Sequence, residues 1–415
     1  MPENKYDVAR IRAQFPILGR QVNGRPLAYL DNAATTQKPV CVLETLEEVT
    51  TTLNANIHRG VHTLSRAMTE RYEQARAVVA AYLQVDNPKD VVFTAGATDG
   101  LNLVANCLPA CCCRPGDKVV VSELEHHSNL VSWQLAAARL GFEVVEWPMR
   151  DDGMLALEDL EPLLDDRVKI VAMSQLSNTL GTLTPVAAVA ALVHSRGIYL
   201  VVDGAQGVKH GPIDLPSMGC DFYAFSSHKI YGPTGVGALW GRHELLAKMP
   251  PYRGGGEMVG TVKFSGTTYA EPPFRFEAGT QAYLQAVGLA KALEFYQSIG
   301  PAAATAHENR LVSLAHDLVA DIPGITFYGY HADNAGILSF NVAGLHHFDV
   351  GTLLDKMGVA VRTGTHCTEP IMDHYGIQGT VRMSLACYST EAEVRQFAEG
   401  LHRSVAMLQS AEGRS

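Results

Sequence analysis

Asp203 and Lys229 each follow an apolar run, and their side-chain types could support cofactor chemistry. A carboxylate at the end of the entirely apolar run 198–202 needs a cationic or hydrogen-bonding partner, and a protonated pyridine nitrogen would serve. A partly desolvated lysine, with Gly232 and Gly235 close behind to let a ligand approach, can form a Schiff base. Taken singly, Asp203 could instead cap a turn and Lys229 could be a solvated loop residue. Together they match the two attachment points of pyridoxal 5'-phosphate (PLP).

The phosphate of such a cofactor also needs hydrogen-bond donors, and the segment "TAGATDG" (94–100) offers them. Thr98 lies where an apolar run, 91–94, gives way to a helix-like pattern. Its hydroxyl and the backbone N–H groups at the start of a helix favour a bound anion.

A third candidate is Cys367, in the short polar loop "RTGTHCTEP" (362–370) after the apolar run 359–361. The loop alone leaves two alternatives open, a nucleophile or a structural cysteine. Only the thiolate attacks well, so a nucleophilic Cys367 must lose its proton. Arg362, His366 or an incoming substrate could favour that loss.

The eight cysteines show no regular disulfide spacing and no CxxC pair, so we expect reduced thiols. The run 111–113 could suggest a metal or iron–sulfur site. Adjacent cysteines point in different directions, however, and rarely ligate one ion together, and the sequence has no second cluster of ligands. We therefore expect an ordinary loop there and no metal site.

The elements that must position these residues are those of an α/β fold. Between about residues 90 and 240, short apolar runs alternate with helical patterns, which is typical of a parallel sheet built from βαβ units. Functional residues should then lie at the carboxyl ends of the strands. The pattern predicts helices at 133–140 and 186–196, and strands at 91–94, 118–122, 143–147, 169–174, 198–203 and 221–225.

The rest of the chain predicts a second, smaller domain. Residues 250–285 are rich in glycine and proline and indicate a surface or interface loop. Helical patterns return at 283–320, strand–helix–strand–strand units follow at 337–387, and a terminal helix is expected near 391–408. We predict a large domain over 21–285, and a small domain formed by 1–20 and 286–415 that carries the cysteine loop.

Composition narrows the class of function. The 415 residues are 47% hydrophobic and 18% charged, which is ordinary for a soluble globular protein, and a formal charge of −10 argues against a nucleic-acid binder. The N-terminus lacks the basic and apolar regions of a signal peptide, and no segment holds about 18 uninterrupted apolar residues. We expect a cytoplasmic protein that acts on small molecules and binds no membrane.

An ordered set of motifs over nearly the whole chain resembles the group II cysteine desulfurases, the SufS/CsdA-like branch of the class-V aminotransferases. The motifs are "YLDNAATT" (29–36), "HRGVHTLS" (58–65), "EHHSNLVSW" (125–133), "DGAQ" (203–206), "SHKIYGPTG" (227–235), "FEAGT" (276–280) and "RTGTHC" (362–367). The resemblance implies a fold-type I PLP-dependent transferase. Such a fold has a large domain with a mostly parallel seven-stranded sheet flanked by helices, and a smaller α+β C-terminal domain.

The resemblance also implies roles for cofactor-binding residues. Lys229 would bind PLP covalently and later move the substrate α-proton, Asp203 would pair with the pyridine N–H, and His126 would stack on the ring. Gln206 would donate to the ring hydroxyl oxygen, and Thr280 would reach the phosphate from the partner subunit of a homodimer. The remaining phosphate positions match Thr98, Ser226, His228 and Ala97, the last standing where many relatives carry a second threonine.

On the substrate side, the resemblance assigns the carboxylate of L-cysteine to Arg382, whose planar fork suits that anion better than a lysine would. Asn178 matches a contact to substrate or cofactor, and Arg362 matches a substrate contact near the cysteine loop. His58 is a weaker match to a substrate contact. Cys367 would attack the substrate sulfur, leaving a persulfide and L-alanine. Because the loop is short, an acceptor protein of the SufE or SufU kind would have to take the sulfur from Cys367. That protein would deliver the sulfur to iron–sulfur cluster assembly or to another sulfur pathway.

Rival functions remain open at this point. A selenocysteine lyase or a kynureninase-like lyase would share the lysine, aspartate and phosphate residues, although kynureninase chemistry gives the cysteine loop no role. A non-catalytic scaffold would be expected to lack Lys229 or Cys367, and both are present. Departures from the family pattern include Ser227, Thr365 and the segment 281–283, so the phosphate site and the loop beside Thr280 could differ in detail.

Overall fold

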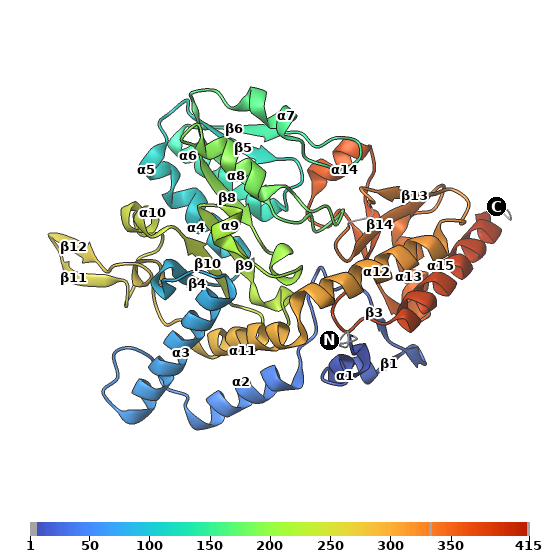
Figure 1. Cartoon of the computed structure of the whole chain (residues 1–415), viewed down its shortest axis with the longest axis horizontal. Helices are drawn as coiled ribbons and strands as arrows, with labels where there is room; N and C mark the ends of the chain where they lie inside the picture. The colour runs from blue at the N-terminus through green and yellow to red at the C-terminus, as the bar shows by residue number, and fades with distance from the viewer. Residues whose placement is uncertain (1–5, 332–333, 413–415) are drawn as a thin grey trace, which may run out of the picture.

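The computed structural model describes residues 6–331 and 334–412, and its largest element is a seven-stranded sheet (Figure 1). The strand order is β4-β10-β9-β8-β7-β5-β6, and β10 is the one strand antiparallel to its two neighbours. All six predicted strands are present with shifts of at most one residue at their ends. The strands are β4 (Val91–Thr94), β5 (Lys118–Ser122), β6 (Glu143–Trp147), β7 (Val168–Ser174), β8 (Tyr199–Asp203), β9 (Phe222–Ser226) and β10 (Gly237–Gly241).

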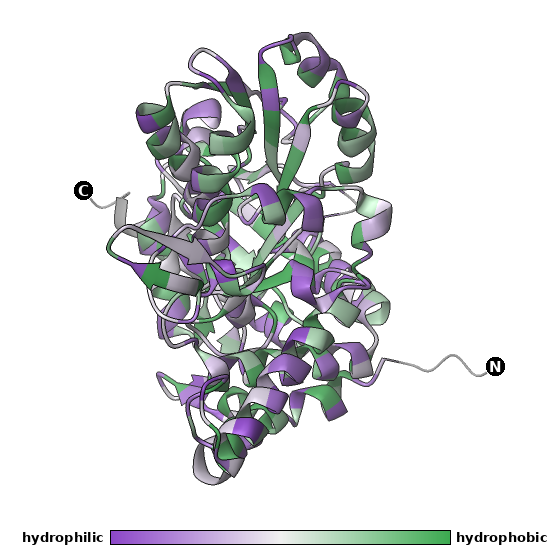
Figure 2. Cartoon of the chain, turned by 90° about the vertical axis from the view of Figure 1, so that its left-hand side faces the viewer, coloured by the Kyte–Doolittle hydropathy of each residue, from purple (hydrophilic) through white to green (hydrophobic). Residues whose placement is uncertain are grey.

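Helices cover both faces of this sheet, so its strands are apolar on both sides. Alternate residues of one strand enter two different cores: Val120 packs in one, and Val119 and Val121 in the other. Figure 2 shows the resulting apolar colouring of strands inside the molecule. The helices of this part are α2 (Val40–Thr52), α3 (Thr63–Tyr82), α4 (Ala97–Cys107), α5 (Pro109–Cys112), α6 (Val131–Leu140), α7 (Leu157–Leu160), α8 (Val186–His194), α9 (Leu215–Met218), α10 (His243–Lys248) and α11 (Tyr283–Ile299).

A second sheet, in the order β13-β14-β17-β16, is antiparallel and has its own apolar core. Its strands are β13 (Ile325–Tyr328), β14 (Ile337–Val342), β16 (Arg362–Gly364) and β17 (Thr380–Ser384). The accompanying helices are α12 (Pro301–Val319), α13 (His347–Lys356), α14 (Glu369–Tyr375) and α15 (Glu391–Glu412). Strand β16 leads directly into the cysteine loop, and α14 follows it.

Strand pairing and helix packing place both boundaries of the larger part at other residues than the predicted 21 and 285. Strand β3 (Ala28–Tyr29) pairs with β15 (Val359–Ala360), so the N-terminal segment stays with the smaller part beyond residue 20. Helix α11 packs against α2 and α3 and therefore belongs with the larger part, although the prediction divided it at residue 285. Composition could not reveal either pairing. Of the predicted small domain, residues 1–5, 332–333 and 413–415 lie outside the described residues.

Two further features complete the N-terminal region. Helix α1 (Val8–Arg12) is tied to the C-terminal region by an ion pair between Arg12 and Glu393 at 2.9 Å. A small hairpin of β1 (Gln21–Val22) and β2 (Arg25–Pro26) follows it.

Within the predicted 250–285 loop the structure has a projecting hairpin, β11 (Val259–Lys263) and β12 (Gly266–Tyr269). Glycine and polar residues around these short strands hid their pattern, so the prediction of a loop was wrong for 259–269, although the hairpin does lie at the surface. Among the described residues, no helix is both long and apolar enough to span a membrane.

Candidate active site

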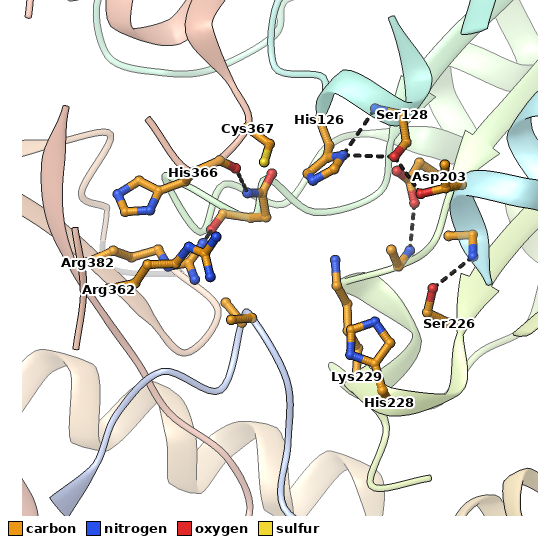
Figure 3. A pocket seen from close by; sticks show the side chains of 16 residues that line it. His126, Ser128, Asp203, Ser226, His228, Lys229, Arg362, His366, Cys367 and Arg382 are labelled. Carbon is orange, nitrogen blue, oxygen red and sulfur yellow. Dashed lines mark hydrogen bonds between the residues drawn. The ribbon is translucent and has the colours of Figure 1, made fainter. Parts of the chain in front are cut away.

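A cavity of about 200 Å³ lies between the carboxyl ends of the large sheet and the cysteine loop (Figure 3). It brings together residues from sequence positions as distant as Ala33 and Arg382. Most of the predicted site residues line it: Ala97, Thr98, His126, Asn178, Asp203, Ser226, His228, Lys229, Arg362, Cys367 and Arg382.

Asp203 and Lys229 reach this cavity from neighbouring strands. Asp203 ends β8, is 5% exposed, and accepts a hydrogen bond from the Ala205 N–H at 2.8 Å. Burial raises the pKa of Asp203, and the nearby Lys229 opposes that rise. Lys229 lies in one turn of 3₁₀ helix directly after β9, where desolvation lowers its pKa to about 8. A buried carboxylate and a lysine that is partly neutral near pH 8 therefore face the same space.

A cradle for an anion forms where β4 leads into α4. The Ala97 N–H at the start of α4 donates to Ser226 Oγ at 2.8 Å, and the Thr98 and Ser128 hydroxyls lie 2.7 Å apart. Gly96 has φ +148°, and a Cβ atom there would lie 3.1 Å from Ser226 Oγ. The helix N-terminus and the hydroxyls make this corner of the cavity suited to a phosphate.

His126 follows β5 and is positioned by a buried carboxylate beside it. Burial lowers the pKa of His126 to about 3, so the imidazole is neutral and can lie against an aromatic ring. Glu125 accepts hydrogen bonds from Asn129 Nδ2 at 2.6 Å and from the Ser174 N–H at 2.6 Å, which joins the ends of β5 and β7. Burial raises the pKa of Glu125 to about 7.

Two arginines form the opposite wall. Arg362 on β16 and Arg382 on β17 are directly paired in register, so two like charges share one face of the sheet. Arg382 donates from Nη1 to the Asn178 carbonyl at 2.9 Å and from Nη2 to Asp31 Oδ1 at 3.1 Å. Its buried Nε has no partner among the described residues. Burial lowers the pKa of Arg382 to about 10, so it stays cationic at neutral pH and can bind a carboxylate.

Backbone contacts hold the cysteine loop over the cavity. Asn178 Nδ2 donates to the His366 carbonyl at 2.9 Å, and the His127 N–H donates to the Cys367 carbonyl at 2.9 Å. The His366 ring contacts Thr380 Oγ1 through Nε2, and its Nδ1 has no partner among the described residues. Burial lowers the pKa of His366, which keeps it neutral. Among the described residues, no hydrogen bond joins this ring to the Cys367 thiol.

Three predicted residues do not line the cavity of their own chain. Gln206 donates from Nε2 to the Ala33 carbonyl at 2.7 Å, while its buried Oε1 has no partner among the described residues. Thr280 lines a separate depression with Ala95 and Asp99. His58 contacts Glu73 of α3 at 3.1 Å and is not among the residues that line the cavity of its own chain.

Other residues of the site were missed by sequence reasoning. Ser128 lines the cavity and links Thr98 to His126 Nδ1, at 2.7 and 3.1 Å. Asp31 balances the charge of Arg382, and Glu125 holds the histidine loop. The available signal for Glu125 was its place at the start of the motif 125–133, three residues after the apolar strand β5. Asp31 and Ser128 lie within the motifs 29–36 and 125–133, but only the tertiary fold shows which partners they contact.

The structure also bears on the metal alternative. Within residues 6–331 and 334–412 there is no group of three or more histidine, cysteine, aspartate or glutamate residues that could hold a metal ion. The described cysteines are all free thiols.

Comparison with known proteins gives the family. The model of the family "Aminotransferase class-V" matches residues 28–397. The chain belongs to the class-V aminotransferase family. It is 44% identical over 403 residues to a cysteine desulfurase of Dickeya dadantii (strain 3937), covering 97% of this chain and 98% of the relative.

Solved structures of family members agree with the fold. The crystal structure of the cysteine desulfurase CsdA from Escherichia coli, in an S-sulfonic acid form, superposes with a TM-score of 0.91 at 38% identity. It covers 97% of this chain and 100% of that one. A C-DES variant described with glycine covalently linked to its PLP cofactor has a TM-score of 0.81 at 25% identity, covering 94% and 98%. The predicted relationship to group II cysteine desulfurases and the predicted fold-type I architecture are confirmed.

Proposed function

We propose that this class-V aminotransferase family member is a PLP-dependent cysteine desulfurase, which transfers sulfur from L-cysteine to Cys367 and releases L-alanine. One observation carries the proposal: a single cavity holds Lys229 and Asp203 on one wall and Arg362, Arg382 and Cys367 on the other. A ligand bound between these walls would meet a base, an anion-binding pair and a thiol at once.

The residues present fit PLP. Asp203 needs a cationic or N–H partner besides Ala205, because it is buried, and the pyridine nitrogen supplies one. The Ala97, Thr98 and Ser226 corner fits the phosphate, and Lys229 fits the aldehyde carbon. When bound, PLP draws electrons from the substrate α-carbon, so that a proton there can be removed.

The chain's own groups then divide the work. Arg382, with Nε free, binds the substrate carboxylate together with Arg362, and this fixes which end of L-cysteine points toward the cysteine loop. Lys229, whose pKa burial lowers to about 8, takes and returns the α-proton. His126 stays neutral and covers the ring face of the cofactor.

Cys367 completes the transfer. Its thiolate attacks the substrate sulfur, a sulfur–sulfur bond forms, and the bond between that sulfur and the substrate β-carbon breaks. The β-carbon takes a proton and L-alanine leaves. The two backbone contacts that fix the loop, at His366 and Cys367, keep the thiol at the cavity.

The test is to incubate the PLP-loaded protein with L-cysteine and to measure alanine and protein-bound persulfide by mass spectrometry. We expect the wild type to form both products over repeated turnovers and the Cys367→Ala variant to form neither. Cys41→Ala, which removes a thiol on α2, is the control and should form both products as the wild type does. Persulfide on cysteines 111–113 with an unimpaired Cys367→Ala variant would contradict the proposal.

The homodimer and the acceptor belong to the same proposal. Thr280 lies outside its own chain's cavity, which supports a role in the partner's phosphate site. Mixing Lys229→Ala and Thr280→Ala chains should restore activity, because one site of the mixed dimer regains both residues, and no recovery would count against the shared site. The anchored Cys367 loop supports delivery of sulfur to an acceptor protein of the SufE or SufU type. Turnover should rise when one is added, and no rise with either type would argue against it.

A further inference from the structure

The cysteine run 111–113 lies away from the active-site cavity. The run lies at the end of α5, and α5 directly follows α4. The first residues of α4 border the cavity, and the eleven residues of this helix place its far end about 16 Å away. Whatever chemistry these thiols perform is therefore separate from sulfur transfer to Cys367.

Two of the thiols face each other, contrary to the expectation that adjacent cysteines point apart. Helix α5 ends at Cys112, and Cys113 has extended backbone angles, φ −106° and ψ 148°. This change of conformation brings Cys112 Sγ and Cys113 Sγ to 3.8 Å from each other. Both side chains are half-buried against the apolar core beneath α5, so they are ordered yet still reachable from solvent.

The other two cysteines of this region are arranged differently. Cys111 is exposed, and its Sγ approaches two backbone carbonyls, those of Cys107 at 3.5 Å and of Lys248 at 3.4 Å. Cys107 is buried in the core. The structure thus singles out one pair from the four.

We propose that Cys112 and Cys113 form a redox-active dithiol, which a low-molecular-weight disulfide oxidises reversibly to a vicinal disulfide. The Cys113 thiolate attacks one sulfur of the reagent, forms a mixed disulfide and expels one thiolate. Cys112 then loses its proton and attacks the Cys113 sulfur, which expels the second thiol. Two protein thiols are oxidised, and one reagent disulfide is reduced to two thiols.

The order of attack follows from the surroundings of the pair. Either thiol can donate in the contact between the two sulfurs. This contact and the charge of Lys169 lower the pKa of Cys113, and they outweigh burial and the charge of Asp117, which raise it. The same contact, together with burial, raises the pKa of Cys112. Because the thiolate is the nucleophile, Cys113 reacts first and Cys112 resolves the mixed disulfide.

Covalent geometry makes the product easy to reduce. Adjacent Cα atoms are about 3.8 Å apart, whereas disulfide-linked Cα atoms usually lie about 4.4–6.8 Å apart. The ring closed by adjacent cysteines is therefore strained, and strained disulfides are the labile ones. The pair suits a reversible switch and not a structural bridge.

The experiment treats the PLP-loaded full chain with oxidised glutathione in a Cys367→Ala background, which removes the active-site thiol. Free thiols are then alkylated and the peptides mapped by mass spectrometry. We expect the peptide with Cys112 and Cys113 to lose two hydrogens and to escape alkylation at both residues. Reduced dithiothreitol should restore both thiols. A persistent glutathione adduct, a bridge that includes Cys111, or no oxidation would overturn the proposal.

Variants separate the two thiols. Cys112→Ser should stop at a glutathione adduct on Cys113, whereas Cys113→Ser should react much more slowly and form no bridge. Cys111→Ser is the matched control and should oxidise as the parent does. Equal behaviour of Cys112→Ser and the parent would overturn the proposal. Cys112→Ala gives the same comparison if the serine variant fails to fold.

Discussion

Replacing Arg382 with lysine keeps the positive charge and removes the planar fork to which we assign the substrate carboxylate. In the structure, Nη1 donates one hydrogen bond to the Asn178 carbonyl, and Nη2 donates one to Asp31. This leaves the N–H of Nε and one N–H of each Nη for the substrate. A lysine can offer one donor in that direction. One lost hydrogen bond between charged groups costs roughly 1.5–3 kcal/mol, so we expect KM for L-cysteine to rise about 10- to 100-fold.

The assay measures initial rates of alanine formation over a range of L-cysteine concentrations, with thermal unfolding as a check on folding. We expect kcat to change by less than about threefold, because Lys229 and Cys367 are untouched. Arg395→Lys, an exposed arginine on α15, is the matched control and should match the wild type. An unchanged KM with a lower kcat would refute the assignment of the carboxylate to Arg382.

Four further predictions concern other residues. The rate at which the apo-protein takes up PLP should rise with pH through a midpoint near 8, because burial lowers the pKa of Lys229 to about 8 and only the neutral amine attacks an aldehyde. A midpoint near the ordinary lysine pKa of 10.5 would contradict this. Asp203→Ala, which removes an opposing charge, should move that midpoint lower. Glu369→Gln removes the half-exposed carboxylate that contacts His127 beside the cysteine loop and should lower kcat by no more than about fivefold, with KM unchanged, in the alanine assay. Glu277→Gln removes one of the two carboxylates that pair with buried Arg76, the other being Glu73, and should lower the free energy of unfolding, measured in urea, by roughly 1.5–3 kcal/mol. A loss under about 1 kcal/mol would show that the pair with Glu277 contributes little.

Local pattern was enough to predict the large sheet and the residues at its edge. Asp203 and Lys229 each follow a run of apolar residues, and strands buried on both faces must be continuously apolar. Since parallel strands present their carboxyl ends at one edge, the two side chains had to lie near each other. The structure places both in one cavity.

The remaining features depend on contacts between segments distant in sequence. Strand β3 has two residues and no pattern of its own, and it exists because β15 pairs with it. Asp31 gains its importance from Arg382, 351 positions away. The Gln206 amide turns to the Ala33 carbonyl, a partner that no spacing rule could identify.

The backbone of the cysteine loop explains why Cys367 can be held at the cavity in so short a segment. His366 and Cys367 both have left-handed angles, φ +55° and +60°, and consecutive non-glycine residues in that region cost roughly 1–3 kcal/mol each. Such a conformation persists only when its surroundings fix it. Here Asn178 binds the first carbonyl and the His127 N–H the second, so both anchors come from loops at the carboxyl edge of the large sheet. The sheet edge that is proposed to hold PLP therefore also anchors the Cys367 loop, and the strained turn makes the thiol's placement depend on the junction between the two sheets.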